Sequence, residues 1–264
     1  MNRLPKILSL ENISINYGSR EIVHDVSFNI NSGEILAIVG ESGSGKSTLL
    51  KAIQHLLGRS GKITQGKILI EGRDLSTLDS ESRRKLAGEF FGMIFQNSSE
   101  SFCPIRKVGD QIFESVRAHC DWDRAEFMNR AEKILDRLDL DKSILDEYPF
   151  RLSGGMGQRA GILAAMILEP KILLADEPTS ALDPQTQMHV AQKFLELRNQ
   201  QNISILIVTH NLGLANFLAD RILIMKDGCI IEEGSCDEIF KSPREIYTRD
   251  LIQAIPRFEY DLAS

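Results

Sequence analysis

The most constraining stretch of this chain is Gly40-Glu41-Ser42-Gly43-Ser44-Gly45-Lys46-Ser47-Thr48, which matches the pattern G-x-x-x-x-G-K-[ST]. It follows an apolar segment, 35–39, and precedes a stretch compatible with a helix, 49–57. A strand before the pattern and a helix after it form the setting in which such a loop binds phosphate. We therefore expect the loop to leave a buried strand and to lead into a helix.

Each residue type in the loop has a physical reason to be there. Glycines let the backbone curl so that several N–H groups point at one cluster of phosphate oxygens. The helix that follows presents the positive end of its dipole to the same phosphates. Lys46 offers a mobile charge to the β- and γ-phosphates, and the Ser47 hydroxyl is a hard oxygen ligand suited to Mg²⁺. The loop predicts binding and hydrolysis of ATP with Mg²⁺, but kinases, GTPases, motors and transporters all share it.

The apolar segments of the chain indicate an α/β fold. Four of them are nearly continuous Ile, Leu, Val and Ala: 35–39, 172–175, 203–208 and 222–225. Strands of a parallel sheet that is covered on both faces have this composition, and here they alternate with helical segments. Residues 25–31 instead alternate polar and apolar side chains, which is typical of a half-buried strand. We expect a phosphate-loop NTPase core with a mainly parallel sheet, and an antiparallel β subdomain at the N-terminus.

The middle of the chain changes character and predicts an inserted helical subdomain, at about 97–168. It is charged, and its helical stretches are Val108–His119, Ala125–Leu138 and Gly155–Leu168. In the last stretch, Ala160, Leu163, Ala164 and Ile167 form one stripe at helical spacing. No Pro-, Gly- or Ser-rich linker separates independent domains. We therefore expect a single ATPase domain over 1–264, with a core of about 1–96 and 169–264.

Charge and hydropathy limit the partners. The chain has 31 Lys and Arg against 37 Asp and Glu, a net charge of −6. Because nucleic-acid binders usually carry a basic face, we expect no nucleic-acid partner. No apolar run approaches the ~20 residues that span a bilayer, and the N-terminus lacks the apolar core of a signal peptide. We expect a cytoplasmic chain, for which a role at the membrane requires a separate membrane-spanning partner.

Polar residues follow three apolar stretches at the point where each ends. Asp176 and Glu177 follow 172–175, Thr209-His210 follows 203–208, and Gln96 follows the shorter stretch 93–95. Because parallel strands deliver their last residues to one edge of the sheet, we expect these side chains near the phosphates. Asp176 is placed to hold Mg²⁺, Glu177 to act as general base toward water, and His210 to donate to the γ-phosphate. The Gln96 amide is placed to contact Mg²⁺ or the attacking water.

A second phosphate site is predicted at Leu152-Ser153-Gly154-Gly155-Met156, which opens a helix. Ser153 is a suitable N-cap, and the two glycines leave backbone N–H groups exposed at the helix start. One nucleotide has one γ-phosphate, and the first loop already holds it from one side. We therefore predict a head-to-tail dimer in which Ser153–Met156 of each chain covers the nucleotide held by the other.

The order of these motifs resembles that of the ATPase subunit of ABC transporters over nearly the whole chain. The carriers are the loop at 40–48, Gln96, Leu-Ser-Gly-Gly at 152–155, Asp176-Glu177, Ser180-Ala181-Leu182-Asp183 and His210. The resemblance implies that Tyr17 stacks on adenine and that Asp183 communicates across the dimer. It also implies that Gln96 couples the nucleotide to the helical subdomain, which contacts the membrane subunits. The implied partners are a second ATPase chain, two permeases and, indirectly, an extracytoplasmic substrate-binding protein, with this chain at the cytoplasmic face of the membrane.

Within that family, the chain resembles the importers of oligopeptides, dipeptides and nickel. The resemblance rests on Met156, Gln158-Arg159, the stretch 101–112 and the tail around Tyr247-Thr248-Arg249; Asn97-Ser98 departs from the Asp-Pro common among relatives. The chain stops at Ser264, eight residues past Pro256, without the cysteine-rich segment often found in the peptide branch. On that length we expect an importer of nickel or a metal-chelate, with a peptide importer as the alternative.

Two further questions stay open at this level. The branch usually pairs two distinct ATPases, so we expect a heterodimer, although both halves of the site are intact here and a homodimer remains open. A non-transport ATPase of the same family is a competing interpretation. Such proteins carry a long coiled-coil insertion or two ATPase halves, whereas Ser153 follows Gln96 by only 57 positions. A small-molecule kinase would leave Leu152–Met156 unexplained.

Overall fold

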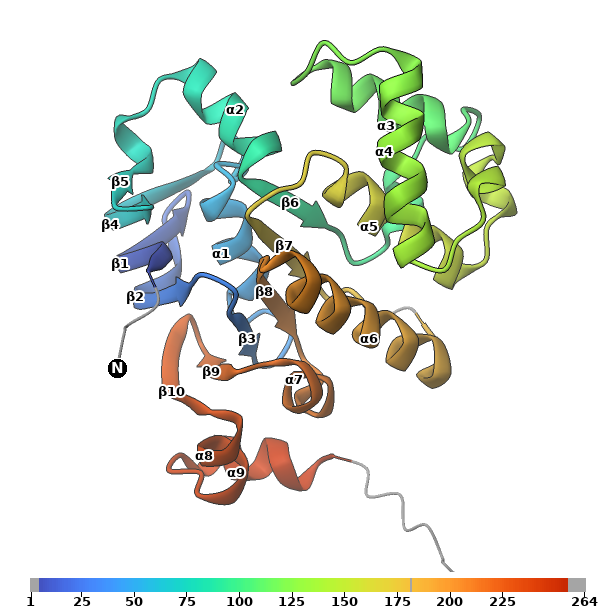
Figure 1. The fold of residues 1–264 in the computed structure, drawn as a ribbon. Helices are drawn as coiled ribbons and strands as arrows, with labels where there is room; N and C mark the ends of the chain where they lie inside the picture. The colour runs from blue at the N-terminus through green and yellow to red at the C-terminus, as the bar shows by residue number, and fades with distance from the viewer. Residues whose placement is uncertain (1–4, 181, 256–264) are drawn as a thin grey trace, which may run out of the picture.

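The strands of the chain form two sheets, which Figure 1 shows in a computed structural model that describes residues 5–180 and 182–255. The larger sheet has the strand order β10-β9-β3-β8-β7-β6. Its members are β3 (Ile35–Val39), β6 (Phe91–Ile94), β7 (Ile172–Asp176), β8 (Ser204–Thr209), β9 (Arg221–Lys226) and β10 (Cys229–Ser235). All neighbouring pairs are parallel except β9 and β10. This confirms the expected mainly parallel core.

The smaller sheet is antiparallel and has the order β2-β1-β4-β5. Its strands are β1 (Lys6–Tyr17), β2 (Arg20–Asn31), β4 (Gly61–Ile70) and β5 (Arg73–Asp74). The sheet comes from the N-terminal part of the chain, as the alternating pattern at 25–31 predicted. Only one of its faces contributes to a core, since every second residue of β2 from Val26 to Ile30 is buried.

Alternation along β3 divides the molecule into layers. Leu36 and Ile38 point into a core shared with the antiparallel sheet and with α1 (Lys46–Ile53). Ala37 and Val39 point to the opposite face, toward α7 (Leu212–Leu218). All five residues of β3 are buried, because both faces are covered. Because β3, β7 and β8 are parallel neighbours, their carboxyl ends meet at one edge of the sheet.

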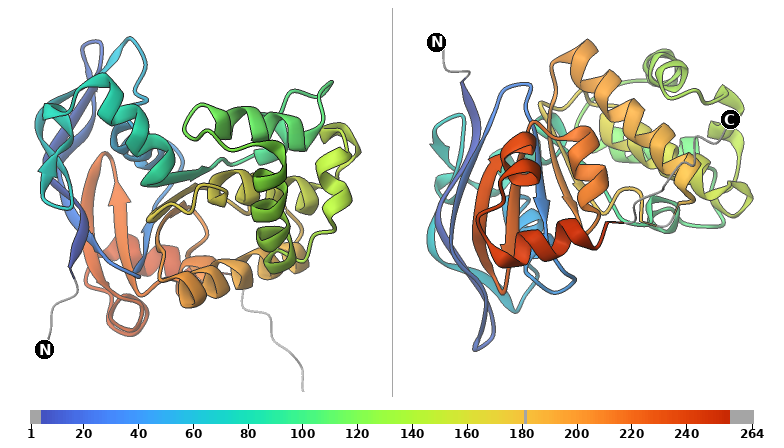
Figure 2. Two further views of the ribbon diagram at one scale, coloured as in Figure 1. Left: turned by 45° about the horizontal axis from the view of Figure 1, so that its top comes forward. Right: turned by 90° about the horizontal axis from the view of Figure 1, so that it is seen from below.

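Helices fill the middle of the chain and form a lobe beyond β6, which Figures 1 and 2 show in green to yellow. They are η2 (Ser98–Ser101), α3 (Val108–Arg117), α4 (Arg124–Arg137), η3 (Lys142–Asp146), η4 (Pro149–Arg151) and α5 (Gly154–Met166). Buried side chains of α3, α4 and α5 share one core with β7 and with α6 (Pro184–Gln201). The lobe therefore has a continuous apolar connection to the sheet.

The remaining helices complete the layers. They are η1 (Leu75–Thr77), α2 (Ser80–Glu89), α8 (Cys236–Lys241) and α9 (Ile246–Gln253). α8 and α9 pack with α7 over the end of the large sheet that carries β9 and β10, as the right-hand view of Figure 2 shows. No helix among residues 5–180 and 182–255 combines the length and the apolar character needed to cross a membrane.

One expected helix has different ends in the structure, and some helices of the structure were not expected. The helix expected at 49–57 begins at Lys46, directly after Gly45, and ends at Ile53. The early end has a backbone cause: Gln54 leaves the helical region, and His55 has a φ of +62°, in the left-handed region. The helices α2 and α6 were not predicted individually. Elsewhere the agreement is close, as for the stretch 108–119, which forms α3 over Val108–Arg117.

Candidate active site

The loop from Gly40 to Thr48 is shaped by three of its glycines. Gly43 and Gly45 have φ of +86° and +103°, a region that favours glycine. Gly40 lies close against β9, since a Cβ on it would lie 2.1 Å from the Met225 carbonyl oxygen. The Gly228 N–H also donates to the Ser44 carbonyl at 3.1 Å. The loop is therefore wrapped tightly at the end of β3 and leads straight into α1.

Lys46 lies inside this loop and is only 5% exposed. Its Nζ donates to the carbonyl oxygens of Gly40 at 2.9 Å and of Glu41 at 2.8 Å. Burial lowers the pKa of the ammonium, while the nearby carboxylates of Glu177 and Asp176 act in the opposite direction. A longer bond runs from Nζ to the Ser44 hydroxyl oxygen at 3.4 Å, so the charge is held entirely by oxygens of the loop itself.

Ser47 and Asp176 meet across the site from two distant parts of the chain. The Ser47 hydroxyl donates to Asp176 Oδ1 at 2.8 Å. Burial raises the pKa of the Asp176 carboxyl, and the neighbouring Glu177 adds to the rise, while the bond from Ser47 opposes it. A hydroxyl and a carboxylate at this distance are hard oxygen donors of the kind that Mg²⁺ prefers. The donor set therefore fits the predicted metal.

Glu177 is held in place from three directions. Its backbone N–H donates to the Val208 carbonyl at 2.8 Å, and its φ of +47° lies in the left-handed region that L-residues rarely adopt. The side chain contacts His210, with Nδ1 to Oε1 at 2.8 Å, and accepts a longer bond from the Thr209 hydroxyl, at 3.4 Å. Strained backbone of this kind costs on the order of 1–3 kcal/mol and persists where surrounding contacts enforce it.

The structure brings most of the predicted site residues to one cavity of about 440 Å³. Its lining consists of Tyr17, Ile22, Ser42, Gly43, Gly45, Lys46, Ser47, Thr48, Gln96, Glu177 and His210. Tyr17 lies at the end of β1, and Gln96 lies two residues beyond the end of β6. These residues come from β1, β2, the phosphate loop with the start of α1, and the segments that follow β6, β7 and β8. The cavity therefore combines an aromatic ring with the phosphate loop.

Ser153, Gly154, Gly155 and Asp183 do not line this cavity. Ser153 is exposed in the helical lobe, where its Oγ accepts the N–H of Met156 at 3.3 Å and caps α5. Asp183 is exposed and caps α6, accepting the N–H groups of Gln185 and Thr186 at 3.1 Å. Those two bonds lower the pKa of Asp183. Ala181, part of the predicted Ser180–Asp183 motif, lies outside the described residues. Within one chain, the two predicted phosphate sites thus remain apart.

Two contacts of the site were not predicted from the sequence. Tyr247 of α9 accepts the backbone N–H of Glu41 at 3.1 Å through its hydroxyl, and burial raises the pKa of that phenol. Thr209 bonds to Glu177 from the end of β8. Nothing in the local sequence around Tyr247 indicates the first contact, because it joins residues 206 positions apart. The second could have been inferred, since Thr209 directly precedes the predicted His210.

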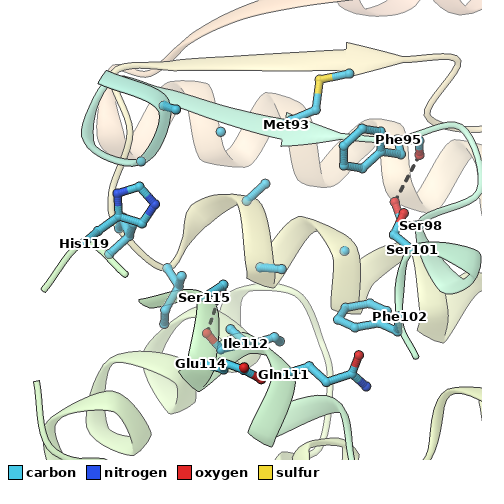
Figure 3. Close-up of a pocket in the computed structure, with 18 of the residues that line it drawn as sticks. Met93, Phe95, Ser98, Ser101, Phe102, Gln111, Ile112, Glu114, Ser115 and His119 are labelled. Atoms are coloured by element: carbon cyan, nitrogen blue, oxygen red, sulfur yellow. Dashed lines mark hydrogen bonds between the residues drawn. The ribbon is translucent and has the colours of Figure 1, made fainter. Parts of the chain in front are cut away.

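A separate groove of about 530 Å³ lies between the helical lobe and the sheet, and Figure 3 shows it from the side. Met93 and Phe95 lie on one side of it, and Ile112 and Gln111 of α3 lie on the other. Gly161, Ala164 and Ala165 of α5 also line it. Phe95 lines this groove, whereas the next residue, Gln96, lines the cavity of the site.

Comparison with known proteins gives one family. Residues 23–180 match the family described as ABC transporter. A Brucella abortus protein whose name describes a peptide import ATP-binding protein is 40% identical, over 97% of this chain and 79% of its own length. The dipeptide transport ATP-binding protein DppD of Escherichia coli K12 is 36% identical, over 97% of this chain and 80% of its own length.

Solved structures give the same picture. The cbiO1 protein of Clostridium perfringens, described as part of the ABC transporter complex cbiONQ, superposes with a TM-score of 0.80 at 27% identity, covering 96% of this chain and 97% of that one. A bacterial ABC transporter cassette, solved as a dimer, gives 0.76 at 28% identity, over 87% and 98%. The same cassette is also known as a dimer bound to ADP and phosphate, at 0.75 and 29%.

Proposed function

This chain belongs to the ABC transporter family and is an ATPase of that type, and we propose that it energises an importer for peptides. The observation that carries the choice of peptides is the 40% identity, over nearly the whole chain, to a protein named for peptide import. The dipeptide transport protein DppD agrees with it. The expectation of nickel or a metal-chelate rested on chain length alone, and no relative described above supports it.

The lining of the cavity suggests one orientation for ATP. We propose that the Tyr17 ring stacks on adenine at one side, while the N–H groups of the loop and the start of α1 hold the phosphates. Lys46 exchanges its bonds to the Gly40 and Glu41 carbonyl oxygens for bonds to phosphate oxygens. The exchange is chemically plausible because the present partners of Lys46 and the phosphate groups are all oxygen acceptors.

The metal would be held by the Ser47 hydroxyl and the Asp176 carboxylate, with the Gln96 amide within the same cavity. When bound there, Mg²⁺ neutralises charge on the transferred phosphoryl group. The raised pKa of Asp176 has a direct consequence, since the protonated acid is a poor ligand. Metal binding should therefore weaken as the pH falls toward that raised pKa.

Hydrolysis requires a base beside the γ-phosphate, and Glu177 is the group that the geometry favours. It takes the proton of the attacking water, while the contact from His210 fixes the direction of the carboxylate. Thr209 bonds to the other carboxylate oxygen and so limits its rotation. Gln96 lines the same cavity and is suited to orient the water.

The opposite side of the γ-phosphate is open within one chain, and we propose that a second ATPase chain closes it. The start of α5 offers the Gly154 and Gly155 N–H groups to the nucleotide of the partner, and Asp183 lies near that contact. Related cassettes form dimers, which supports this arrangement. The partner is a distinct ATPase or a second copy of this chain.

The groove beside Gln96 is the surface that we propose for the permeases. It is lined by Met93, Phe95 and Ile112 and lies between the lobe and the sheet, so a bound helix would contact both (Figure 3). Such an arrangement places the chain at the cytoplasmic face of the membrane, attached through two permease subunits. A substrate-binding protein outside would then select the cargo.

Uptake measurements test the proposal. A strain that lacks this gene is complemented with the wild-type chain or with Glu177→Gln, and uptake of a labelled dipeptide, a labelled pentapeptide and labelled nickel is compared. We expect the wild-type chain alone to restore uptake of at least one peptide and to leave nickel uptake unchanged. If the wild-type chain restores only nickel uptake, the chain instead energises an importer of nickel or a metal-chelate. If no uptake changes, the role in import is wrong.

A further inference from the structure

The helix α5, whose N-cap is Ser153, is packed very closely against the loop that carries Gln96. A Cβ on Gly161 of α5 would lie 2.2 Å from Ser98 Cβ and 2.5 Å from Ser98 Oγ. Real Cβ contacts are essentially never this short, so no larger residue fits at 161 while the loop keeps its position. Ser98 is 1% exposed, although it is polar.

A second glycine extends the same contact along the strand. Gly92 of β6 faces α5, and a Cβ there would lie 2.3 Å from the Ala165 carbonyl oxygen. One glycine thus lies on the helix and the other on the strand that leads to Gln96, and their contacts on α5, at Gly161 and Ala165, are about one helical turn apart. A rigid strand, the following loop and α5 therefore form one packed unit.

Hydrogen bonds fix the direction of this contact. Gln158 of α5 is 4% exposed; its Oε1 accepts the Ser98 N–H and its Nε2 donates to the Phe95 carbonyl, both at 3.4 Å. The Ser98 hydroxyl donates to the same Phe95 carbonyl at 3.0 Å, the bond that Figure 3 draws as a dashed line. The buried polar groups on both sides of Gln96 thus find their partners on α5 or within the loop.

We propose that Gln158, Gly161 and Ser98 form a coupling junction that links the two ATP sites of a dimer through one chain. The inference rests on the proposed function, in which Gln96 lies at the chain's own ATP and Ser153 at the ATP of the partner. A shift of the loop on ATP binding also moves α5, because Ser98 and Gly161 are packed without space between them. The start of α5 therefore moves with the loop, and occupancy of one site changes the closure of the other.

The departure at Asn97-Ser98 gains a reason from this geometry. Ser98 supplies both a small side chain, which fits above Gly161, and a backbone N–H, which bonds to Gln158. A proline at this position has no N–H to donate. Gln158, Gly161 and Ser98 are positioning residues, since the structure places none of them on the lining of the nucleotide cavity.

The test uses the chain in its assembled transporter and measures ATP hydrolysis against ATP concentration. Gly161→Ala forces the loop and α5 apart, and Gln158→Met removes the polar bonds while keeping the side-chain length. We expect each variant to bind ATP as a monomer within about twofold of wild type, since the phosphate loop is untouched. Hydrolysis should fall by about two- to thirtyfold, the range that such contacts carry, and its Hill coefficient should fall toward about 1.

A reciprocal pair of double variants separates coupling from general damage. Ser98→Gly with Gly161→Ala removes the atoms that clash and should recover both the rate and the Hill coefficient. Ser98→Ala with Gly161→Ala keeps the clashing Cβ and should not recover them. The proposal is overturned if the two doubles behave alike, or if Gly161→Ala and Gln158→Met keep the wild-type Hill coefficient. A wild-type assembly whose two sites act independently would instead refute the paired-site function, and this inference with it.

Discussion

Asp176 and Glu177 are adjacent in sequence, but their surroundings assign them different tasks. Asp176 ends β7 as a half-buried carboxyl that accepts a hydrogen bond from Ser47, whereas Glu177 leaves the strand in a left-handed conformation and its carboxylate contacts His210. The sequence predicted that both carboxylates lie at the edge of the sheet, because parallel strands deliver their last residues there, while the roles of metal ligand and general base stay predictions. It could not predict the left-handed turn, which the contact with Val208 enforces from a distant strand.

Asp176→Asn should make the chain more stable and inactive. The pKa of Asp176 is raised, mainly by burial, so its contribution to stability is present below the ordinary value of aspartate and is lost as the pH rises through the raised value. At pH 7 the ionised group therefore lowers the free energy of unfolding. Urea unfolding of the nucleotide-free chain should show a gain of about 0.5–2 kcal/mol at pH 7 that disappears near about pH 3. A loss of stability at pH 7 would contradict this account.

Glu177→Gln should separate binding from hydrolysis. Glutamine can still accept the bond from His210, so the site keeps its shape, but it cannot take a proton from water. We expect hydrolysis in the assembled transporter to fall about 10²- to 10⁴-fold, as for loss of a general base. Equilibrium binding of ATP to the isolated chain should stay within about twofold of wild type. A variant that retains its turnover would remove Glu177 from this role.

At the scale of elements, local patterns predicted types better than ends. The four apolar segments all became strands, because burial on both faces imposes one composition. The end of α1 at Ile53 depends on the left-handed turn at His55, which has no local signal. The helix α6 was missed although Asp183 caps it and Pro184 begins it, a combination typical of a helix start.

The N-terminus of α5 is the element whose proposed task lies outside its own chain. Ser153→Arg puts a large cation where a second chain's nucleotide would approach, while ATP binding to the chain's own loop should not change. In the assembled transporter we expect hydrolysis to fall about a hundredfold or more, the scale of losing donors to the transferred group. Ser153→Ala is the matched control, since it removes the cap without adding bulk and should cost only about 1 kcal/mol of stability. Equal hydrolysis by the arginine variant and wild type would rule out this contact.

At the scale of the whole molecule, the two predicted phosphate sites, the loop Gly40–Thr48 and the start of α5, lie on different lobes of one chain. The sequence predicted this separation. One nucleotide has one γ-phosphate, which the loop at 40–48 already holds from one side, so the second site is expected to serve the nucleotide of another chain. The way in which the lobes are joined could not be predicted, since the contact between Ser98 and Gly161 spans 63 residues and depends on two small side chains. The cargo also lies beyond the structure of this chain, because recognition of the cargo belongs to its proposed partners.

The most direct measurement of the account compares ATP turnover per chain in two states of assembly. The isolated chain is shown to be monomeric by light scattering under assay conditions, and its turnover is compared with that of the same chain in the assembled transporter. We predict that the monomer binds ATP but hydrolyses it at least about tenfold more slowly, because the far side of the γ-phosphate lacks donors. A monomer that hydrolyses ATP at the rate of the assembled transporter would contradict the claim that this chain holds half of the active site.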